Sequence, residues 1–263
     1  DQRVSMTILL LALTNIAMLA ALALILHKVR RLHIAMFELT DKVGEIHAES
    51  KENYGQIQAY LDLVRLLKLE SPLPRLRGWA ASPDFLLVVA KHALQHKPKM
   101  IVECSSGAST IVLAQCLKMN GTGHVYSLEH DIKFAEITRQ NLSNAGLLSW
   151  ATVIDAPLKS LDEKTESIWY TTDGIDNVDQ IDMLVVDGPP ASTCHHARHP
   201  ALPRLKMKFA PICHLFLDDA DRKEEQETVS RWQEEKQNFK TISTTKYMCE
   251  KGCVHITLNK ANS

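Results

Sequence analysis

The feature that most constrains the fold of this chain is a short apolar strand that ends in an acid and runs into a turn of small residues. The segment is Met100–Thr110, with the sequence MIVECSSGAST, and the next apolar segment along the chain also ends in an acid, at Glu129. This arrangement is typical of a nucleoside pocket at the carboxyl edge of a parallel sheet. Small side chains let the backbone approach a ligand, and the second carboxylate can hold ribose hydroxyls.

The composition of this turn narrows the choice of nucleoside. A dinucleotide site needs three glycines so that pyrophosphate can sit on a helix N-terminus. Only Gly107 is present here, with Ser105, Ser109 and Thr110 beside it. S-adenosylmethionine carries no phosphate, and its cationic sulfonium and amino groups suit a site lined by Glu103 and other acids. The turn therefore favours a methyl-donor site over a nicotinamide site, another nucleotide site, or a tight connection without a ligand.

The first 27 residues predict a membrane anchor. Residues 4–26 carry no charge, and at about 1.5 Å per residue they can cross a hydrocarbon layer of about 30 Å. Lys28, Arg30 and Arg31 follow this run, whereas Arg3 alone precedes it. The positive-inside rule therefore predicts a single-pass protein of the cell inner membrane with its globular domain in the cytoplasm. A cleaved signal peptide fits poorly, because the run is long and its basic residues follow it.

A heptad pattern over residues 28–70 predicts a coiled-coil stalk and hence a homo-oligomer. The alternative is a single amphipathic helix that lies on its own domain or along the membrane surface. Pro72 and Pro74 end the helix and mark the start of a domain at 71–263. The two series of the heptad are Val29, Met36, Val43, Ser50, Ile57 and Val64, and Leu32, Leu39, Ile46, Asn53, Tyr60 and Leu67.

Residues 71–263 alternate predicted helices and strands. Ser82-Pro83-Asp84 predicts a helix start in which the serine hydroxyl caps a helix that continues to His96. We expect a doubly wound, mostly parallel Rossmann-like sheet of seven strands with an antiparallel edge. Residues 155–170 are expected to be irregular, and a helix is expected near 195–208. Five predicted strands end at acids on the ligand-binding edge: Glu103, Glu129, Asp155, Asp187 and Asp218.

Composition and charge exclude some classes of function. The chain has 263 residues, 45% of them apolar, and a formal net charge of −1. That is enough for one sizeable α/β domain with appendages. The absence of a basic cluster in the globular part argues against nucleic acid as a partner. The six scattered cysteines are expected to be reduced thiols.

Four segments carry a family resemblance: ECSSGAST at 103–110, SLEHD at 127–131, VVDGPP at 185–190 and LDDA at 217–220. Together they resemble class I S-adenosylmethionine-dependent methyltransferases, most closely the bacterial small-molecule O-methyltransferases of the macrocin and catechol type. The resemblance covers about residues 75–258. It implies the seven-stranded methyltransferase sheet and S-adenosyl-L-methionine as the cofactor.

The resemblance also implies where the donor binds. The family's usual glycine in the turn is Ser105 here, a departure that we expect to weaken donor binding rather than abolish it. The implied donor-binding residues are Glu103, Ser105, Gly107 and Ser109 at the methionine end, Glu129 and His130 at the ribose, and Asp155 and Ala156 beside adenine.

The chemistry of transfer suggests further residues. Asp187, Asp218 and Asp219 end two strands that such a sheet places side by side, and in the metal-dependent branch the corresponding acids bind Mg²⁺, which orients a substrate hydroxyl. The alternative is that these acids cap a turn and a helix. The candidate catalytic residues are Asp187 and, because histidine suits a general base near neutral pH, His195 and His196.

Two functions follow as hypotheses. The first is a membrane-anchored, oligomeric methyltransferase that acts, with Mg²⁺, on a hydroxyl of a small or lipid-linked acceptor. The second is a non-catalytic, membrane-tethered coiled-coil subunit of a larger membrane complex that carries a degenerate methyltransferase fold. Ser105 and the long stalk motivate the second hypothesis.

Overall fold

The computed structural model describes residues 2–76, 78, 80–161, 167–235 and 239–260. The chain divides into two units, residues 1–54 and residues 55–263. The first unit is the greater part of α1 (Gln2–Leu67), one continuous helix. By length and composition alone, α1 is able to cross a membrane, and its apolar side chains from Val4 to Leu26 are exposed.

Residues 28–55 of the expected stalk are also exposed in the single chain, whereas Leu63 and Leu67 near its end are buried. Apolar side chains from both heptad series, among them Val29, Leu32, Met36 and Val43, lie on the surface of α1. The coiled coil therefore stays a prediction.

The end of α1 belongs to the second unit. Leu63 and Leu67 are fully buried in its core. The helix stops at Leu67, and the Gln115 side-chain amide donates to the Leu67 carbonyl oxygen at 2.9 Å. This bond satisfies one of the carbonyls that a helix end leaves without an intrahelical partner.

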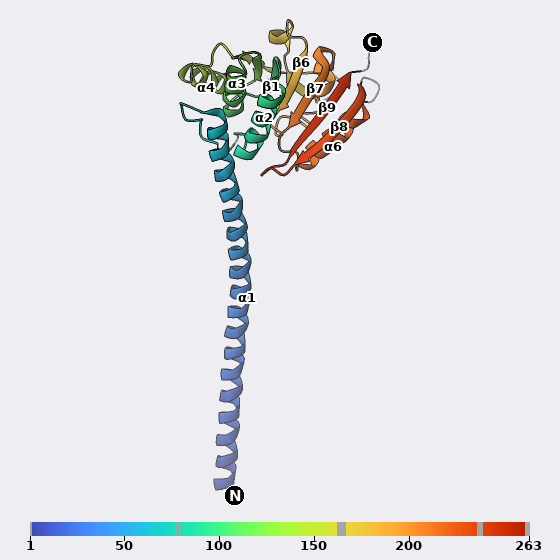
Figure 1. Ribbon diagram of the computed structural model, residues 1–263. Helices are drawn as coiled ribbons and strands as arrows, with labels where there is room; N and C mark the ends of the chain where they lie inside the picture. Colours follow the sequence, from blue (N-terminus) through green and yellow to red (C-terminus); the bar gives the residue numbers. More distant parts are fainter. Residues whose placement is uncertain (1, 77, 79, 162–166, 236–238, 261–263) are drawn as a thin grey trace. The chain divides into compact units, whose positions relative to one another are not determined.

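A seven-stranded sheet in the order β3-β2-β1-β6-β7-β9-β8 forms the centre of the second unit (Figure 1). The first five strands in this order are parallel, whereas β9 is antiparallel to both β7 and β8. The doubly wound sheet with an antiparallel edge is thus confirmed. The strands are β1 Met100–Cys104, β2 His124–Glu129, β3 Ala151–Asp155, β6 Ile181–Val186, β7 Phe209–Leu217, β8 Phe239–Tyr247 and β9 Cys253–Lys260.

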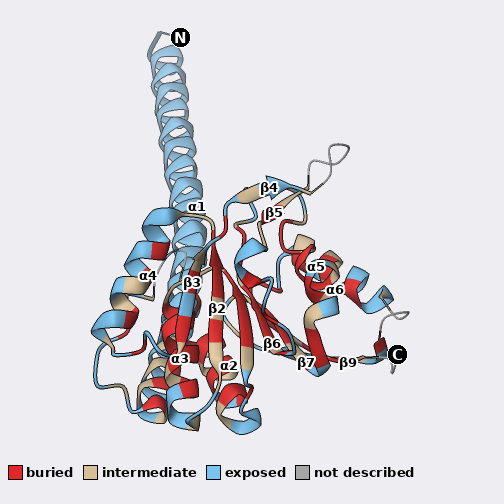
Figure 2. Cartoon of the chain, turned by 90° about the horizontal axis from the view of Figure 1, so that it is seen from above, coloured by how far each residue is buried: buried red, intermediate tan, exposed pale blue. Residues whose placement is uncertain are grey.

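Two apolar cores flank the sheet, because successive residues of a strand point to opposite faces. Ile101 lies in the core under α2, α3 and α4, and its neighbour Val102 lies in the core under α5 and α6. Figure 2 shows the central strands as buried between these helices. The helices of this unit are α2 Pro83–His96, α3 Ala108–Asn120, α4 Ile132–Asn144, α5 Ala201–Leu205 and α6 Lys223–Glu234, with short 3-10 turns η1 Asp173–Ile175 and η2 Lys206–Lys208.

Three local expectations need correction. The Ser82 hydroxyl does not cap α2 but donates to the Asp84 carboxylate at 2.6 Å, and that carboxylate accepts from the Phe85 amide. Residues 155–170 are not wholly irregular, since β4 (Leu158–Ser160) pairs with β5 (Ile168–Tyr170). The helix near 195–208 is only the short α5, because Pro200 disfavours helical backbone in the residue before it.

Candidate active site

The turn after β1 is held in a conformation that favours glycine. Ser105 has a φ of 97° and Gly107 a φ of 154°. Residues other than glycine rarely adopt positive φ, so Ser105 is strained where the family usually has glycine. Its amide donates to the Leu128 carbonyl oxygen at 2.9 Å, which holds the turn against β2.

The side chain of Glu103 holds this turn through hydrogen bonds. Its side chain is fully buried, and its Oε2 accepts from the hydroxyls of Thr110 and Ser127, each at 2.6 Å. Thr110 Oγ1 in turn accepts from the Gly107 amide at 3.0 Å. Burial raises the pKa of the Glu103 carboxyl, and the hydroxyls of Ser109, Ser127 and Thr110 oppose that rise.

A cavity of about 590 Å³ opens above the turn at the carboxyl edge of the sheet. This volume lies within the range of small-molecule pockets. Glu103, Asp155 and Ala156 are not on its wall. The wall is formed by Pro74, Arg75, Gly78, Ala80 and Ala81, by residues 105–109, by Glu129, His130, Asp131, Phe134, Ile137, Thr138 and Asn141, and by Asp187, Pro190, Ser192, Arg198, Asp219, Arg222 and Lys251.

Glu129 lies on this wall with its carboxylate fixed. Its Oε2 accepts from the Ser106 amide at 2.9 Å and from the Ser106 hydroxyl at 3.0 Å. Its Oε1 accepts from the Asp131 amide at 3.0 Å and lies 3.2 Å from Nδ1 of His130. The carboxylate is therefore oriented before a ligand arrives, and a ligand hydroxyl would compete with the Ser106 hydroxyl for Oε2.

Asp155 and Ala156, the two residues expected beside adenine, are not on the cavity wall. Asp155 ends β3 and pairs with Arg139, whose Nη2 is 2.6 Å from Oδ1 of Asp155. Ala156 is fully buried in the core under α5 and α6. In contrast, Ser105, Gly107, Ser109, Glu129 and His130 all lie on the cavity wall.

The three acids expected to bind Mg²⁺ surround the buried guanidinium of Arg198. Nη2 of Arg198 donates to Oδ2 of Asp219 at 2.6 Å and to Oδ1 of Asp187 at 3.4 Å. Nη1 donates to the Asp218 carbonyl oxygen at 2.8 Å. Asp218 Oδ1 accepts from the Asp219 amide at 2.8 Å.

This arrangement does not fit a magnesium ion. Mg²⁺ takes one or two carboxylates with waters and substrate oxygens in octahedral geometry. Here a side-chain cation stands among the three acids and bonds to Asp187 and Asp219, while Asp218 is turned to the backbone. Asp187 and Asp219 are thus counter-charges for Arg198.

The carboxyl of Asp187 has a raised pKa. Burial raises the pKa of its carboxyl to about 7, with Arg198 opposing the rise and Asp219 adding to it. The pKa of Asp218 is also raised, by burial and by Asp187. A carboxylate with a pKa near neutrality is suited to general base catalysis. Asp187 faces the cavity, so it can meet a substrate there.

The two histidines expected as bases point to α6 instead. The His195 side chain is 90% exposed, and its Nδ1 lies 2.9 Å from Oε1 of Glu224. The Nε2 of His196 lies 3.1 Å from Nη2 of Arg231 and 3.3 Å from Oε2 of Glu227. Neither histidine is on the cavity wall.

Sequence reasoning missed the cations of the cavity. Arg75, Arg198, Arg222 and Lys251 all lie on its wall, and Arg198 and Arg222 pair with Asp219. One signal was available: three acids at the ends of neighbouring strands require a counter-charge, and Arg198 is the first cation after Asp187 in the sequence.

Comparison with known proteins identifies the domain and its fold. Residues 102–220 match a family described as a methyltransferase domain. An O-methyltransferase from Bacillus cereus in complex with SAH superposes with a TM-score of 0.57 at 17% identity, over 80% of this chain and 97% of that one. The O-methyltransferase TomG from Streptomyces achromogenes, in complex with SAM, gives a TM-score of 0.53 at 18% identity, over 81% and 96%. No curated protein matches the chain.

The family match identifies a methyltransferase domain over residues 102–220. The sheet order and the solved structures give the chain the fold of S-adenosylmethionine-dependent methyltransferases, as the resemblance predicted. At these identities the likeness to the solved structures concerns the fold.

Proposed function

We propose that this chain is a membrane-tethered methyltransferase that transfers a methyl group from S-adenosylmethionine to a hydroxyl of a small or lipid-linked acceptor, with Asp187 as general base and without Mg²⁺. One observation carries the proposal. Asp187, with a pKa of about 7, lies on the wall of the same cavity as the Ser105–Ser109 turn and Glu129.

The donor end of the cavity suits a cationic nucleoside. When bound, S-adenosylmethionine supplies a methyl group activated by its sulfonium. Glu129 would accept hydrogen bonds from the ribose hydroxyls, and Asp131 adds a second negative charge nearby. The backbone of Gly107 adjoins open space, so a ligand can approach it closely.

The acceptor end would hold the hydroxyl against Asp187. The Asp187 carboxylate removes the hydroxyl proton while the oxygen's electron pair forms the new bond to the methyl carbon. The carbon–sulfur bond of the donor breaks, its electron pair stays on sulfur as a neutral thioether, and the proton remains on Asp187. General base catalysis of this kind contributes about 10²- to 10⁴-fold to a rate.

Arg198 takes the place in this proposal that Mg²⁺ has in the metal-dependent branch. Its guanidinium balances Asp187 and Asp219 from inside the protein. Lys251 adds positive charge on the same wall, as does Arg222, whose Nη1 also lies 2.9 Å from Oδ2 of Asp219. An acceptor that carries an anionic group beside its hydroxyl therefore suits this end.

The N-terminal helix supports the membrane part of the proposal. An uncharged segment at residues 4–26 is followed by three cations at 28–31, which favours an inner-membrane anchor with a cytoplasmic domain. The exposed heptad residues Val29, Leu32, Met36 and Val43 favour association with a second copy. A tether of this kind keeps the enzyme near lipid-linked acceptors.

Transfer of label tests the proposal. The full-length chain in nanodiscs is incubated with methyl-labelled S-adenosylmethionine, 3,4-dihydroxybenzoate and an extract of bacterial inner-membrane lipids, with EDTA present. We expect label in an acceptor fraction, a rate at least about 100-fold lower for Asp187→Asn, and an unchanged rate for the matched control Asp155→Asn. Donor binding without transfer to any fraction would favour the non-catalytic subunit, and an unchanged rate for Asp187→Asn would remove its role as base.

A further inference from the structure

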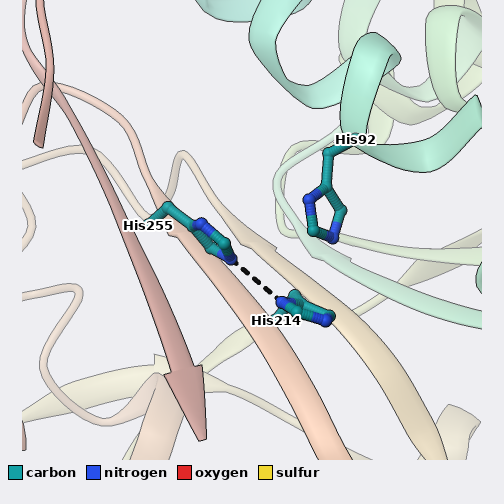
Figure 3. Close-up of side chains that lie close together, drawn as sticks. All are labelled: His92, His214 and His255. Atoms are coloured by element: carbon teal, nitrogen blue, oxygen red, sulfur yellow. Dashed lines mark hydrogen bonds between the residues drawn. The ribbon is translucent and has the colours of Figure 1, made fainter. Parts of the chain in front are cut away.

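Four histidines gather on the face of the sheet that α2 covers, outside the cavity. His92 and His96 lie one turn apart on α2, His214 lies on β7, and His255 lies on β9. None of them is on the cavity wall. Figure 3 shows the rings of His92, His214 and His255 converging from these three elements.

The nitrogen atoms of three of these rings are close enough to share an ion. One ring nitrogen from each of His92, His214 and His255 lies within 4.8 Å of the other two. Nδ1 of His214 and Nε2 of His255 are 3.0 Å apart. With bonds of 2.0–2.1 Å from zinc to nitrogen, tetrahedral ligands lie about 3.4 Å apart. Small rotations of the three rings would therefore bring their nitrogen atoms to the spacing that a zinc ion requires.

One of these nitrogens lacks any other partner. Nε2 of His92 is buried and has no hydrogen-bond partner among the described residues. A buried polar atom without a partner is destabilising, and native proteins seldom leave one without a reason. A metal ion bound to Nε2 of His92 would give this buried atom a partner.

The surroundings hold the rings in place. Phe216 stacks on His255 with ring centroids 4.3 Å apart and an interplanar angle of 2°, and it meets His92 edge-on at 4.9 Å. The cluster also lies near the C-terminal end of α2. Helix C-termini carry partial negative charge, which favours a cation.

We propose that His92, His214 and His255 form a binding site for one zinc ion per chain, with water in the fourth position. Imidazole is a preferred ligand of Zn²⁺, and zinc sites with three histidines and a water are well precedented. His214 would bind through Nδ1 and His255 through Nε2, so the hydrogen between them moves to the far nitrogen of its own ring. No net proton is lost in this step.

The site would join α2 to β7 and β9. The cavity follows the carboxyl ends of the strands, whereas the C-terminal end of α2 leads into the amino end of β1. The ion is therefore expected to stabilise the fold without contacting the reacting groups. Binding to the folded chain alone raises the melting temperature by mass action.

Zinc titration of the intact protein tests the proposal. The full-length chain, purified in detergent without a histidine tag and stripped with a chelator, is titrated with Zn²⁺ against a chromophoric competitor. We expect one ion per chain, a higher melting temperature with Zn²⁺, and at least a 30-fold weaker affinity in both His214→Gln and His255→Gln. The matched control is His124→Gln, because His124 lies on β2 and bonds to Thr152.

A second readout keeps the test independent of folding. Co²⁺ bound at a tetrahedral nitrogen site absorbs visible light, and that band is expected in the wild type and in His124→Gln but not in His255→Gln. Circular dichroism checks that each variant is folded. Zinc binding that is equally strong in the wild type and in folded His214→Gln and His255→Gln, or no binding above that of the competitor, would overturn the proposal.

Discussion

Nη2 of Arg198 lies 2.6 Å from Oδ2 of Asp219, and the side chains are only 4% and 5% exposed. A charge pair so far from water is held by its own hydrogen bonds, and loss of one partner leaves the other charge buried. The pair thus fixes the acidic end of the cavity, where Asp187 also bonds to Arg198.

Removal of this cation is expected to cost stability. Arg198→Met should lower the free energy of unfolding by about 3 kcal/mol or more, since Asp187 loses its counter-charge and Asp219 keeps only Arg222. The measurement is chemical denaturation at pH 8. The matched control is Arg139→Met, whose partner Asp155 is largely exposed, and which should lose no more than about 1 kcal/mol. Equal losses in the two variants would contradict the buried role of Arg198.

The strained turn predicts a stabilising substitution. Ser105 adopts a φ of 97°, which glycine adopts without strain. Ser105→Gly should raise the free energy of unfolding by about 1 kcal/mol and should not weaken donor binding. Ser106→Gly serves as the contrast, because it removes the hydroxyl bond to Glu129 and should lower stability. A loss of stability in Ser105→Gly would show that the serine is not strained.

Asp187 gives the enzyme a predictable dependence on pH. Its pKa in the folded chain is about 7, above the usual 3.8, so the folded state binds this proton more tightly than the unfolded state. Its contribution to stability is complete below about pH 4 and is lost as the pH rises through about 7. Asp187→Asn should therefore raise the melting temperature at pH 8 and change it less at pH 5. Wild-type turnover should rise through about pH 7, and a flat profile would contradict the base assignment.

The stalk predicts the oligomeric state. Met36 and Val43 belong to one heptad series and are exposed in the single chain. The double variant Met36→Glu, Val43→Glu should dissociate the oligomer to monomers, as measured by light scattering in detergent. Lys42→Glu lies outside both series and should leave the oligomer intact. A monomeric wild type would favour the amphipathic-helix alternative.

Much of the fold follows from local sequence pattern. The strands β1, β2 and β3 and the helices between them are set by apolar runs, turns and caps near in sequence. The strands β4 and β5 have three residues each, too few for an alternating pattern to be recognised.

The site is less predictable because it depends on distant residues. Arg198 reaches Asp187 and Asp219 only when the segment after β6 folds back over two strand ends. The histidine site draws on α2, β7 and β9. Its one local signal is the spacing of His92 and His96 by four residues, which places two imidazoles on one helix face.

Calorimetric titration of the full-length chain in nanodiscs with S-adenosylmethionine and S-adenosylhomocysteine tests most directly whether the cavity holds a methyl donor. We predict one site per chain, unaffected by EDTA. The affinity should be at least about tenfold weaker in Glu129→Gln, because a hydrogen bond to a charged group contributes about 1.5–3 kcal/mol. Asp155→Asn should bind as the wild type does. No heat at high micromolar donor, or equal affinity in the wild type and Glu129→Gln, would contradict the assignment of this cavity.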